Sequence, residues 1–169
     1  MMIGHMGTHA VNVSLYSKVN FDPVKDFTPL GLVVDIPAVL VAHPSVPAKS
    51  VRELIALAQS KPGQITYASS GVGTGPHLAA ELFAMLAGVK LNHVPYRGAG
   101  PAMQDLIAGH VQIVFAPVSE AIQQIKAGKL RALAVTTKAR LDVFPDIPTV
   151  GDFVPGYEAS GFAGIGVPK

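Results

Sequence analysis

The sequence predicts an α/β fold built from βαβ units around a parallel sheet. Between Val39 and Thr136, short apolar segments typical of strands alternate with amphipathic segments typical of helices, at a spacing of roughly 20–25 residues. The expected strands are apolar on both faces, which a sheet covered by helices on both sides requires. Gly and Pro, which number 17 and 14 among 169 residues, punctuate these segments. We therefore expect one α/β lobe over this stretch.

The composition excludes several other classes of protein. Hydrophobic residues make up 49% of the chain, charged residues make up 14%, and the net charge is +2, which together exclude a disordered chain. The absence of Cys excludes a disulfide scaffold and a Cys-based zinc site. No run of roughly 18 uninterrupted apolar residues occurs, as a membrane span would need. Few charges of mixed sign argue against nucleic-acid binding.

The first part of the chain has a less regular pattern. Residues Met1–His5 lack the basic and apolar regions of a secretory signal, which indicates either a cytosolic protein or a leader outside this sequence. Residues 8–16 are expected to start a short helix, followed by a loop. Residues 30–42 then predict one or two strands, interrupted at Pro37 because proline has no N–H to give to a ladder.

Residues that typically begin or end helices and strands mark the boundaries of the elements of the lobe. Ser50 and Glu53 have the spacing of a capping box at the start of a helix. Four helices are expected to end just before Lys61, Gly88, Gly109 and Gly128. Strands are expected at residues 65–68, 91–94, 111–116, 130–136 and 162–167, the last after a long loop rich in Pro and Gly.

A glycine-rich loop, Ser69–Gly75, lies between an expected strand and the start of an expected helix. Unpaired N–H groups at a helix start and the helix dipole favour an anion, and glycines let it approach the backbone closely. A dinucleotide site would have glycine where Pro76 stands and an acid near the end of the next strand, and a Walker A loop would carry Gly-Lys-Ser/Thr. Neither pattern is present, so a carboxylate is the simpler anion. A plain tight turn with a capping Ser or Thr is the alternative.

Two further loops are expected at the same edge of the sheet, where the carboxyl ends of parallel strands meet. In the loop 94–100, Arg97 could neutralise an anion and Tyr96 could donate a hydrogen bond or stack. A solvated surface charge is the alternative for Arg97. After the next strand, Ala116 could line a pocket through its backbone, and Ser119 is expected to cap the following helix.

The sequence offers little for catalysis or for a metal. His5 and His9 are four residues apart without the Glu of a metalloprotease helix, so we expect no metal and no cofactor. No Gly-x-Ser-x-Gly elbow and no paired carboxylates for acid–base chemistry occur. His77, in the first turn of the helix after the glycine loop, is expected to pack or to line a pocket. We therefore expect a binding protein and not an enzyme.

Five motifs, in the same order, resemble those of the tripartite tricarboxylate transporter substrate-binding proteins, the Bug-type or TctC-like receptors. They are Pro44–Ser50, the segment Tyr67–Phe83 around the glycine loop, His93–Gly98, Ala127–Thr136 and Pro145–Thr149. The similarity extends over essentially the whole chain.

This resemblance implies a type II periplasmic-binding-protein fold, in which two α/β lobes are joined by two crossing strands. It implies that a periplasmic receptor holds a small organic anion, usually a carboxylate or dicarboxylate, and hands it to a two-component membrane permease. The ligand-binding residues that it implies are Thr8, His9, Ser70, Gly71, Gly73, Thr74, Pro95, Tyr96, Arg97, Gly98 and Ala116.

Members of this family are considerably longer, so the resemblance implies that the chain holds essentially one lobe. Residues 1–36 would be a remnant of lobe one with the first hinge strand, 37–160 lobe two, and 161–169 the returning hinge strand. Because exposed edge strands tend to pair with another chain, we expect self-association. The alternatives are an α/β enzyme that uses the glycine loop with His77 or His93 as its base, and a ligand-sensing effector domain of a transcription regulator.

Overall fold

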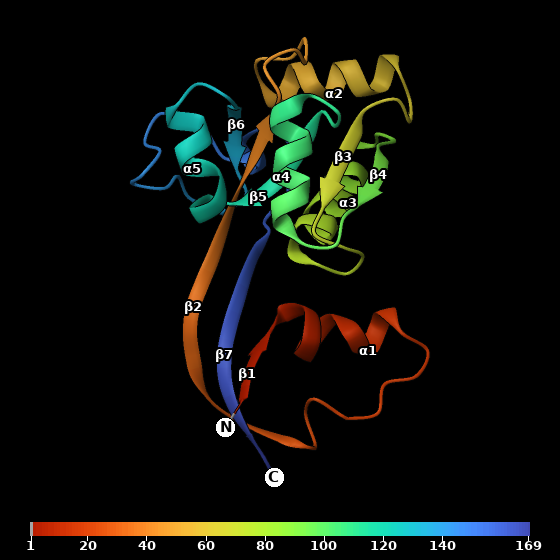
Figure 1. Cartoon of the computed structure of the whole chain (residues 1–169), viewed down its shortest axis with the longest axis vertical. Coiled ribbons are helices and arrows are strands. Elements are labelled where there is room, and N and C mark those ends of the chain that lie inside the picture. Colours follow the sequence, from red (N-terminus) through yellow and green to blue (C-terminus); the bar gives the residue numbers. More distant parts are fainter. Residues whose placement is uncertain (1) are drawn as a thin grey trace.

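The computed structural model describes residues 2–169 and contains two sheets that share one long strand, β2 (Phe27–Ala42). The last residues of β2 lie inside the larger sheet, which we name the main sheet. Its earlier residues pair with β7 (Ser160–Pro168), and β7 pairs with β1 (Met2–His5), to form what we name the ribbon sheet. Figure 1 shows most of the helices gathered around the main sheet, and β2 and β7 running away from it to the region where both ends of the chain lie.

The main sheet has the strand order β6–β2–β5–β3–β4. Its other members are β3 (Thr66–Ser69), β4 (Asn92–Pro95), β5 (Ile113–Pro117) and β6 (Arg131–Val135). The predicted parallel pairing is confirmed for β3 with β4 and for β3 with β5. The prediction is wrong for β2, which runs antiparallel to both β5 and β6 because it enters this sheet from the ribbon and not through a helical crossover.

Four α-helices flank the main sheet, and they end where the sequence predicts. They are α2 (Val51–Ser60), α3 (Gly75–Ala87), α4 (Ala99–Ala108) and α5 (Val118–Lys126). The Ser50 side chain accepts a hydrogen bond from the Glu53 N–H at 3.2 Å, which caps α2 as expected. Gly88 and Gly109 follow α3 and α4 in the left-handed conformation. None of the helices within residues 2–169 is long and apolar enough to cross a membrane.

Two separate cores cover the two faces of the main sheet. On one face Leu40 and Phe115 pack with Phe83 of α3, and on the other Val39 and Val114 pack with Leu106 of α4. Successive residues of β2 and β5 alternate between the two cores, as side chains of a strand must. This arrangement explains why β5 and the part of β2 within the main sheet are apolar at every position.

Pro37 does not interrupt β2, contrary to the sequence prediction. In the ribbon sheet β2 pairs only with β7, so it is an edge strand, and both Pro29 and Pro37 lie in this part. An edge strand tolerates proline because one side of its backbone has no ladder partner. From Ala38 onward β2 has a partner on each side, and no further proline occurs in it.

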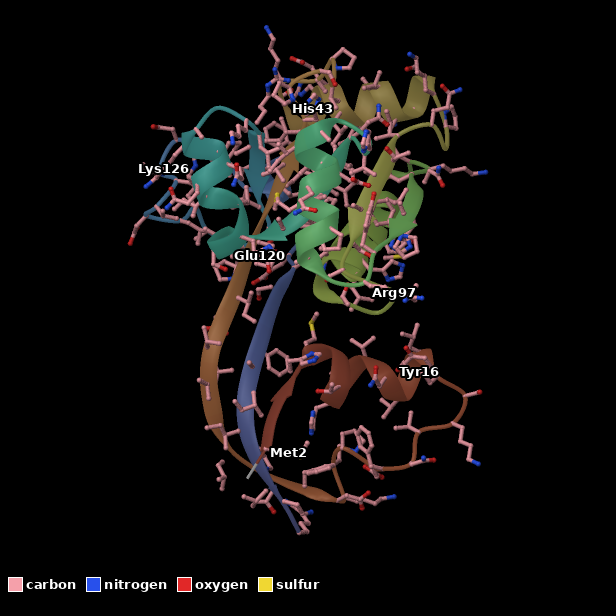
Figure 2. All side chains as sticks on the ribbon, in the orientation of Figure 1. Met2, Tyr16, His43, Arg97, Glu120 and Lys126 are labelled. Carbon is pink, nitrogen blue, oxygen red and sulfur yellow. The ribbon has the colours of Figure 1, made fainter. Side chains whose placement is uncertain are left out.

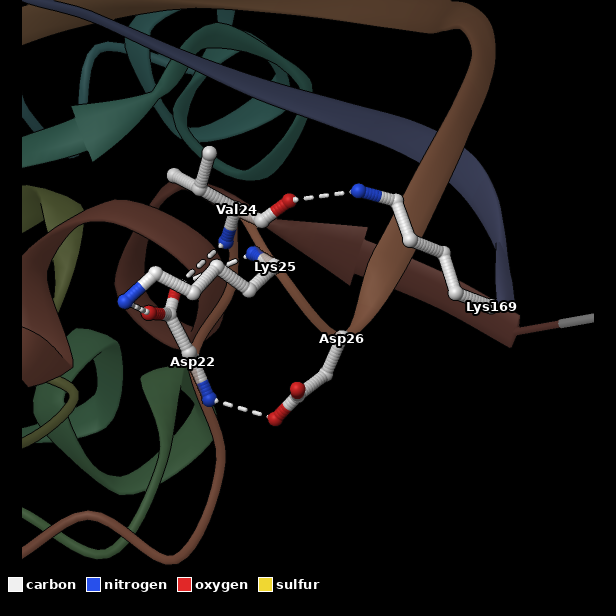
Figure 3. A network of polar contacts seen from close by, with 5 residues as sticks. All are labelled: Asp22, Val24, Lys25, Asp26 and Lys169. Atoms are coloured by element: carbon white, nitrogen blue, oxygen red, sulfur yellow. Dashed lines mark hydrogen bonds and ion pairs between the residues drawn. The ribbon is translucent and has the colours of Figure 1, made fainter.

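The N-terminal segment is helical where the sequence predicts, with a π-helical turn Gly7–Val11 followed by α1 (Asn12–Leu15). The chain then returns through a loop to β2. Figure 3 shows how this loop is closed: the Asp22 carboxylate accepts hydrogen bonds from the Val24 and Lys25 N–H groups, and Lys169 Nζ donates to the Val24 carbonyl at 3.3 Å. The end of the chain therefore lies against the start of β2.

The core that contains Leu40, Phe83 and Phe115 predicts a large loss of stability when Phe83 is truncated. Its ring is fully buried, with its centroid 5.6 Å from that of Phe115 and 6.3 Å from that of Tyr157. We expect Phe83→Ala to lower the free energy of unfolding by about 3–5 kcal/mol in urea denaturation, through lost burial and a cavity. On the same helix Met85 is 69% exposed, so Met85→Ala should change it by less than about 0.5 kcal/mol. Equal losses in both variants would contradict this packing.

Candidate anion-binding site

The loops that follow β3 and β4 lie side by side at one edge of the main sheet. Ser69 and Pro95 are register partners at the ends of these strands, and the Tyr96 N–H donates to the Ser69 carbonyl at 3.0 Å. A side chain at Gly71 would place its Cβ 3.6 Å from the Tyr96 carbonyl oxygen. The structure therefore brings the glycine loop and the loop carrying Arg97 together, as their place after parallel strands predicts.

Three helices begin at this edge, and none of them is capped by a side chain. The N-cap residues are Thr74 for α3, Gly98 for α4 and Pro117 for α5. The prediction that Ser119 caps α5 is wrong, because the helix begins earlier, at Val118, and places Ser119 inside the first turn. The N–H groups of three first turns are therefore left for another acceptor, and three helix dipoles add positive potential at one edge.

The glycine loop is held by hydrogen bonds of its own. The Thr74 hydroxyl donates to the Gly71 carbonyl at 2.6 Å, and the Gly73 N–H donates to His77 Nδ1 at 3.2 Å. Gly71 and Gly73 have φ angles of 132° and 79°, which only glycine adopts without strain. Among the hydrogen bonds of residues 2–169, none uses the Ser70 hydroxyl, so this group is the side-chain donor that the loop has free.

The rings of Tyr67, His77 and His93 pack against one another next to the glycine loop. The ring of His93 on β4 lies 4.7 Å from that of Tyr67 and 4.4 Å from that of His77. Tyr67 donates from its hydroxyl to the carboxylate of Glu81 on α3. Burial, and then the nearby His77, lower the pKa of His93, while Glu81 opposes the shift. The sequence predicts that His77 packs or lines a pocket, but this contact between a strand and a helix carries no sequence signal.

Tyr96 is not a free hydrogen-bond donor. Its hydroxyl donates to the carboxylate of Asp105 on α4, and burial together with this bond raises the pKa of Tyr96 to about 12. The same bond, followed by that from His110, lowers the pKa of Asp105. Tyr96 therefore fixes the turn, whereas the neighbouring Arg97 is exposed and forms no ion pair within residues 2–169. We name the main sheet together with helices α2 to α5 the main body. Figure 2 shows Arg97 at the edge of the main body that faces Tyr16 of the N-terminal segment.

A cleft of about 460 Å³ lies between the main body, the ribbon sheet and the N-terminal segment. From the main body it is lined by the first turns of α3, including Gly75 and Pro76, and by Phe115 and Pro117 of β5; the ribbon contributes residues 160–162 among others. Sequence reasoning missed these lining residues, because only the folded chain places the ribbon next to α3. The lining is mostly apolar.

Ser70 and Ala116 meet in a smaller hollow beside this cleft. It has a volume of about 10 Å³ and shares Pro76 and Pro117 with the cleft. Glu120 of α5 also lines it, and burial raises the pKa of this carboxyl group. Two of the predicted ligand-binding residues therefore lie where the starts of α3, α4 and α5 converge.

Thr8 and His9 lie away from the loops that follow β3 and β4. The Thr8 hydroxyl donates to the His5 carbonyl at 3.0 Å and lies 2.8 Å from His9 Nδ1. The His9 ring packs against Phe27, with 5.1 Å between ring centroids, and lines a second cavity of about 380 Å³ beside the ribbon sheet. Other residues of this segment approach the glycine loop: the side chains of Val11 and Leu15 lie against Gly73, and a Cβ on Gly7 would lie 3.6 Å from the Gly73 carbonyl oxygen.

The described residues offer no metal site, and the hydroxyl that lies closest to a histidine nitrogen is buried. No group of three or more His, Cys, Asp or Glu side chains within residues 2–169 could hold a metal ion. Ser69 Oγ lies 2.6 Å from His93 Nε2, a distance typical of a nucleophile and its base. The Ser69 side chain is fully buried, however, and is bonded to both the N–H and the carbonyl of Gly71.

Comparison with curated proteins finds relatives along most of the chain. The chain is 38% identical over 156 residues to a UPF0065 protein in the tcbD–tcbE intergenic region of Pseudomonas sp. strain P51, covering 91% of this chain and 46% of that protein. It is 34% identical over 161 residues to protein BugT of Bordetella pertussis, covering 95% of this chain and 49% of that protein. The chain thus spans about half the length of these relatives.

Solved structures share its fold. The structure titled "R. palustris Rpa4515 with adipate" has a TM-score of 0.92 at 36% identity, with 99% of this chain and 56% of that chain covered. MatC from Rhodopseudomonas palustris with bound malate has a TM-score of 0.89 at 31% identity, with 98% and 57% covered. The periplasmic binding protein BugD has a TM-score of 0.90 at 33% identity, with 99% and 56% covered. The predicted type II periplasmic-binding-protein-like fold, essentially one lobe with hinge strands, is confirmed.

The sequence model of the tripartite tricarboxylate transporter family receptors matches residues 2–169. With this match over essentially its whole length, the chain belongs to the TctC family of receptors.

Proposed function

We propose that this chain is part of a solute-binding receptor that binds a small organic anion, a carboxylate or dicarboxylate. The observation that carries the proposal is the meeting of three helix starts without side-chain caps at one edge, beside the cleft. Such an edge stabilises a negative charge through N–H groups and helix dipoles. Two structurally similar proteins are titled as complexes with adipate and malate, which supports this ligand class.

The predicted ligand-binding residues divide into three groups by the part that each would play. Backbone groups of Gly71, Gly73, Pro95, Gly98 and Ala116 would shape the site, and Tyr96 would hold its turn in place through Asp105. Ser70 and Thr74 would act from the glycine loop, with Arg97 supplying the positive charge. Thr8 and His9, from the N-terminal segment, line neither the cleft nor the hollow, so their part in binding stays a prediction.

We propose further that the intact protein is periplasmic and delivers its ligand to a two-component membrane permease. Within it, residues 37–160 would form lobe two, 1–36 a remnant of lobe one with the first hinge strand, and 161–169 the returning hinge strand. Deleting the gene in its host should abolish uptake of the ligand, and the intact protein should be recovered in a periplasmic extract.

We infer that the protein binds its ligand without transforming it. The Ser69 hydroxyl, bonded to His93, has no exposed surface with which to reach a substrate. The Ser45 hydroxyl is exposed and bonded to His43, but His43 lies at the end of the molecule away from the cleft (Figure 2). Incubating the intact protein with a bound carboxylate should return the carboxylate unchanged, as followed by one-dimensional NMR of the ligand. Turnover would favour the α/β enzyme instead.

Arg97 offers the sharpest test of the site. We expect Arg97→Ala to weaken binding of adipate or malate by about 1–3 kcal/mol in isothermal titration calorimetry, because a charged hydrogen-bond donor is lost. Thr74→Ala should weaken it by a similar amount, by releasing the Gly71 carbonyl. The control is Arg52→Ala, an equally exposed arginine on α2, where no change is expected. Unchanged affinity in both site variants would remove these residues from the site.

We propose also that a second copy of the chain covers the apolar ribbon. Large apolar side chains are exposed along β2, with Leu32 62% and Val33 59% exposed. The pairing with β7 is irregular between Leu32 and Val34, and all three side chains from Leu32 to Val34 are exposed there. Exposed apolar surface of this kind marks an interaction site.

This proposal predicts the oligomeric state. In size-exclusion chromatography with light scattering, the chain should exceed the mass of a monomer, and the double variant Leu32→Asp/Val33→Asp should be monomeric. The matched control, Met85→Asp/Leu86→Asp, places the same charges on exposed apolar residues of α3 and should leave the association intact. A monomeric wild-type chain at high concentration would refute self-association.

A further inference from the structure

The cleft of about 460 Å³ between the main body, the ribbon sheet and the N-terminal segment follows α3 along its axis. Gly75, Leu78 and Leu82 all line it, so the lining begins at the first residue of α3 and continues to Leu82. At the rise of an α-helix this stretch is about 10 Å long. The cleft therefore has one end at the start of α3 and extends away from that start for about two helical turns.

The end at the start of α3 is the one that suits a carboxylate. Gly75 and Pro76 line it from the first turn of α3, and Pro117 lines it at the start of α5. Pro76 and Pro117 also line the small hollow that contains Ser70. Both helix starts lack a side-chain cap, so their N–H groups and dipoles favour an anion at this end of the cleft.

Most of the side chains that line the rest of the cleft are apolar. Leu78 and Leu82 contribute from α3, Phe115 from β5, and Ile36 and Phe162 from the ribbon sheet. Phe162 is 40% exposed, and Leu78, Leu82 and Ile36 are half-buried, so they have apolar surface left to cover a ligand. A hydrocarbon chain gains free energy by leaving water for such a surface. A hydroxyl group loses its hydrogen bonds to water there.

The polar side chains that line the cleft offer no partner for a second carboxylate. Among the described residues they are His5, Glu158 and Ser160, and no Lys or Arg lines the cleft. Glu158 follows Tyr157, whose hydroxyl donates at 3.1 Å to the Ala79 carbonyl in the second turn of α3. The negative charge of Glu158 therefore lies beyond the start of that helix. His5 Nδ1 accepts from the Gly7 N–H at 3.1 Å, which requires an unprotonated nitrogen.

We propose that the cleft selects a monocarboxylate with an apolar body, such as a short straight-chain fatty acid, over dicarboxylates and hydroxy acids. The carboxylate lies at the starts of α3 and α5, and the hydrocarbon chain runs along α3 against Leu78, Leu82 and Phe162. Glu158 opposes a second negative charge. The inference rests on the proposed function and narrows its ligand class.

A series of straight-chain monocarboxylates tests the apolar body of the ligand. From butanoate to hexanoate, affinity in isothermal titration calorimetry should rise about three- to fourfold with each added methylene, because each one is buried against apolar side chains. Leu78→Asn, which keeps the size of the side chain but makes it polar, should flatten this rise. The control is Met85→Asn on the exposed face of α3, which should keep it. Affinity that ignores chain length in the wild type, or a full rise in Leu78→Asn, would overturn the proposal.

Hexanoate and adipate test the charge at the second end of the ligand. They have the same number of carbon atoms, but adipate ends in a second carboxylate where hexanoate ends in a methyl group. We expect hexanoate to bind about tenfold more tightly to the wild-type chain. Glu158→Gln should narrow this ratio, because a like charge is removed. Glu53→Gln, the same change on α2 at the opposite edge of the main sheet, should leave the ratio unchanged.

The same titrations separate this inference from the proposed function. If adipate or malate binds as tightly as hexanoate or more tightly, the chain is still a carboxylate receptor, but the selection of an apolar body is refuted. If none of the carboxylates binds, the proposed function fails and the inference fails with it. The wild-type series gives these answers without any variant, so they do not depend on whether Leu78→Asn folds.

Discussion

The shared direction of β3, β4 and β5 is the constraint on which the site depends. Because the loops after all three strands emerge at one edge, the helices α3, α4 and α5 all begin there. β2 runs the other way, so α2, which follows it, begins at the opposite edge. At that opposite edge the helix start is satisfied by Ser50, whereas the three starts at the shared edge have no side-chain cap. Strand direction thus decides which helix starts are available to an anion.

The hydrogen bonds around the glycine loop limit what the site can offer. The Thr74 hydroxyl, the Gly73 N–H and the Tyr96 hydroxyl are all used within the protein. Fewer hydrogen-bond donors are therefore free to bind an anion than a count of polar residues indicates. The exposed Arg97 and the Ser70 hydroxyl are the main candidates that remain. A loop fixed in this way loses little conformational entropy when a ligand binds, which favours affinity for a small anion.

Much of the fold was predictable, because local chemistry decides it. Glycines such as Gly88 and Gly109 end helices through their own backbone conformation, and Ser50 begins one through its own side chain. The failures at Pro37 and Ser119 arise because edge pairing and the exact start of a helix are set by tertiary structure. The site was predictable as a set of loops. The bonds that hold them were not, since they join residues such as Ser69 and His93 that are 24 positions apart.

The two sheets differ in how completely other parts of the chain cover their apolar faces. The main sheet carries a core on each face, with Phe83 and Leu106 at their centres, so it satisfies the requirement that an apolar sheet be covered on both sides. The ribbon has no comparable cover, and Leu32 and Val33 lie exposed on it. The main sheet is therefore covered within the chain itself, whereas the apolar surface of the ribbon is left uncovered, as the proposed self-association requires. The shared edge itself is built from the main sheet and its helices, whereas the ribbon lines the cleft beside that edge, so the two sheets meet at the candidate site.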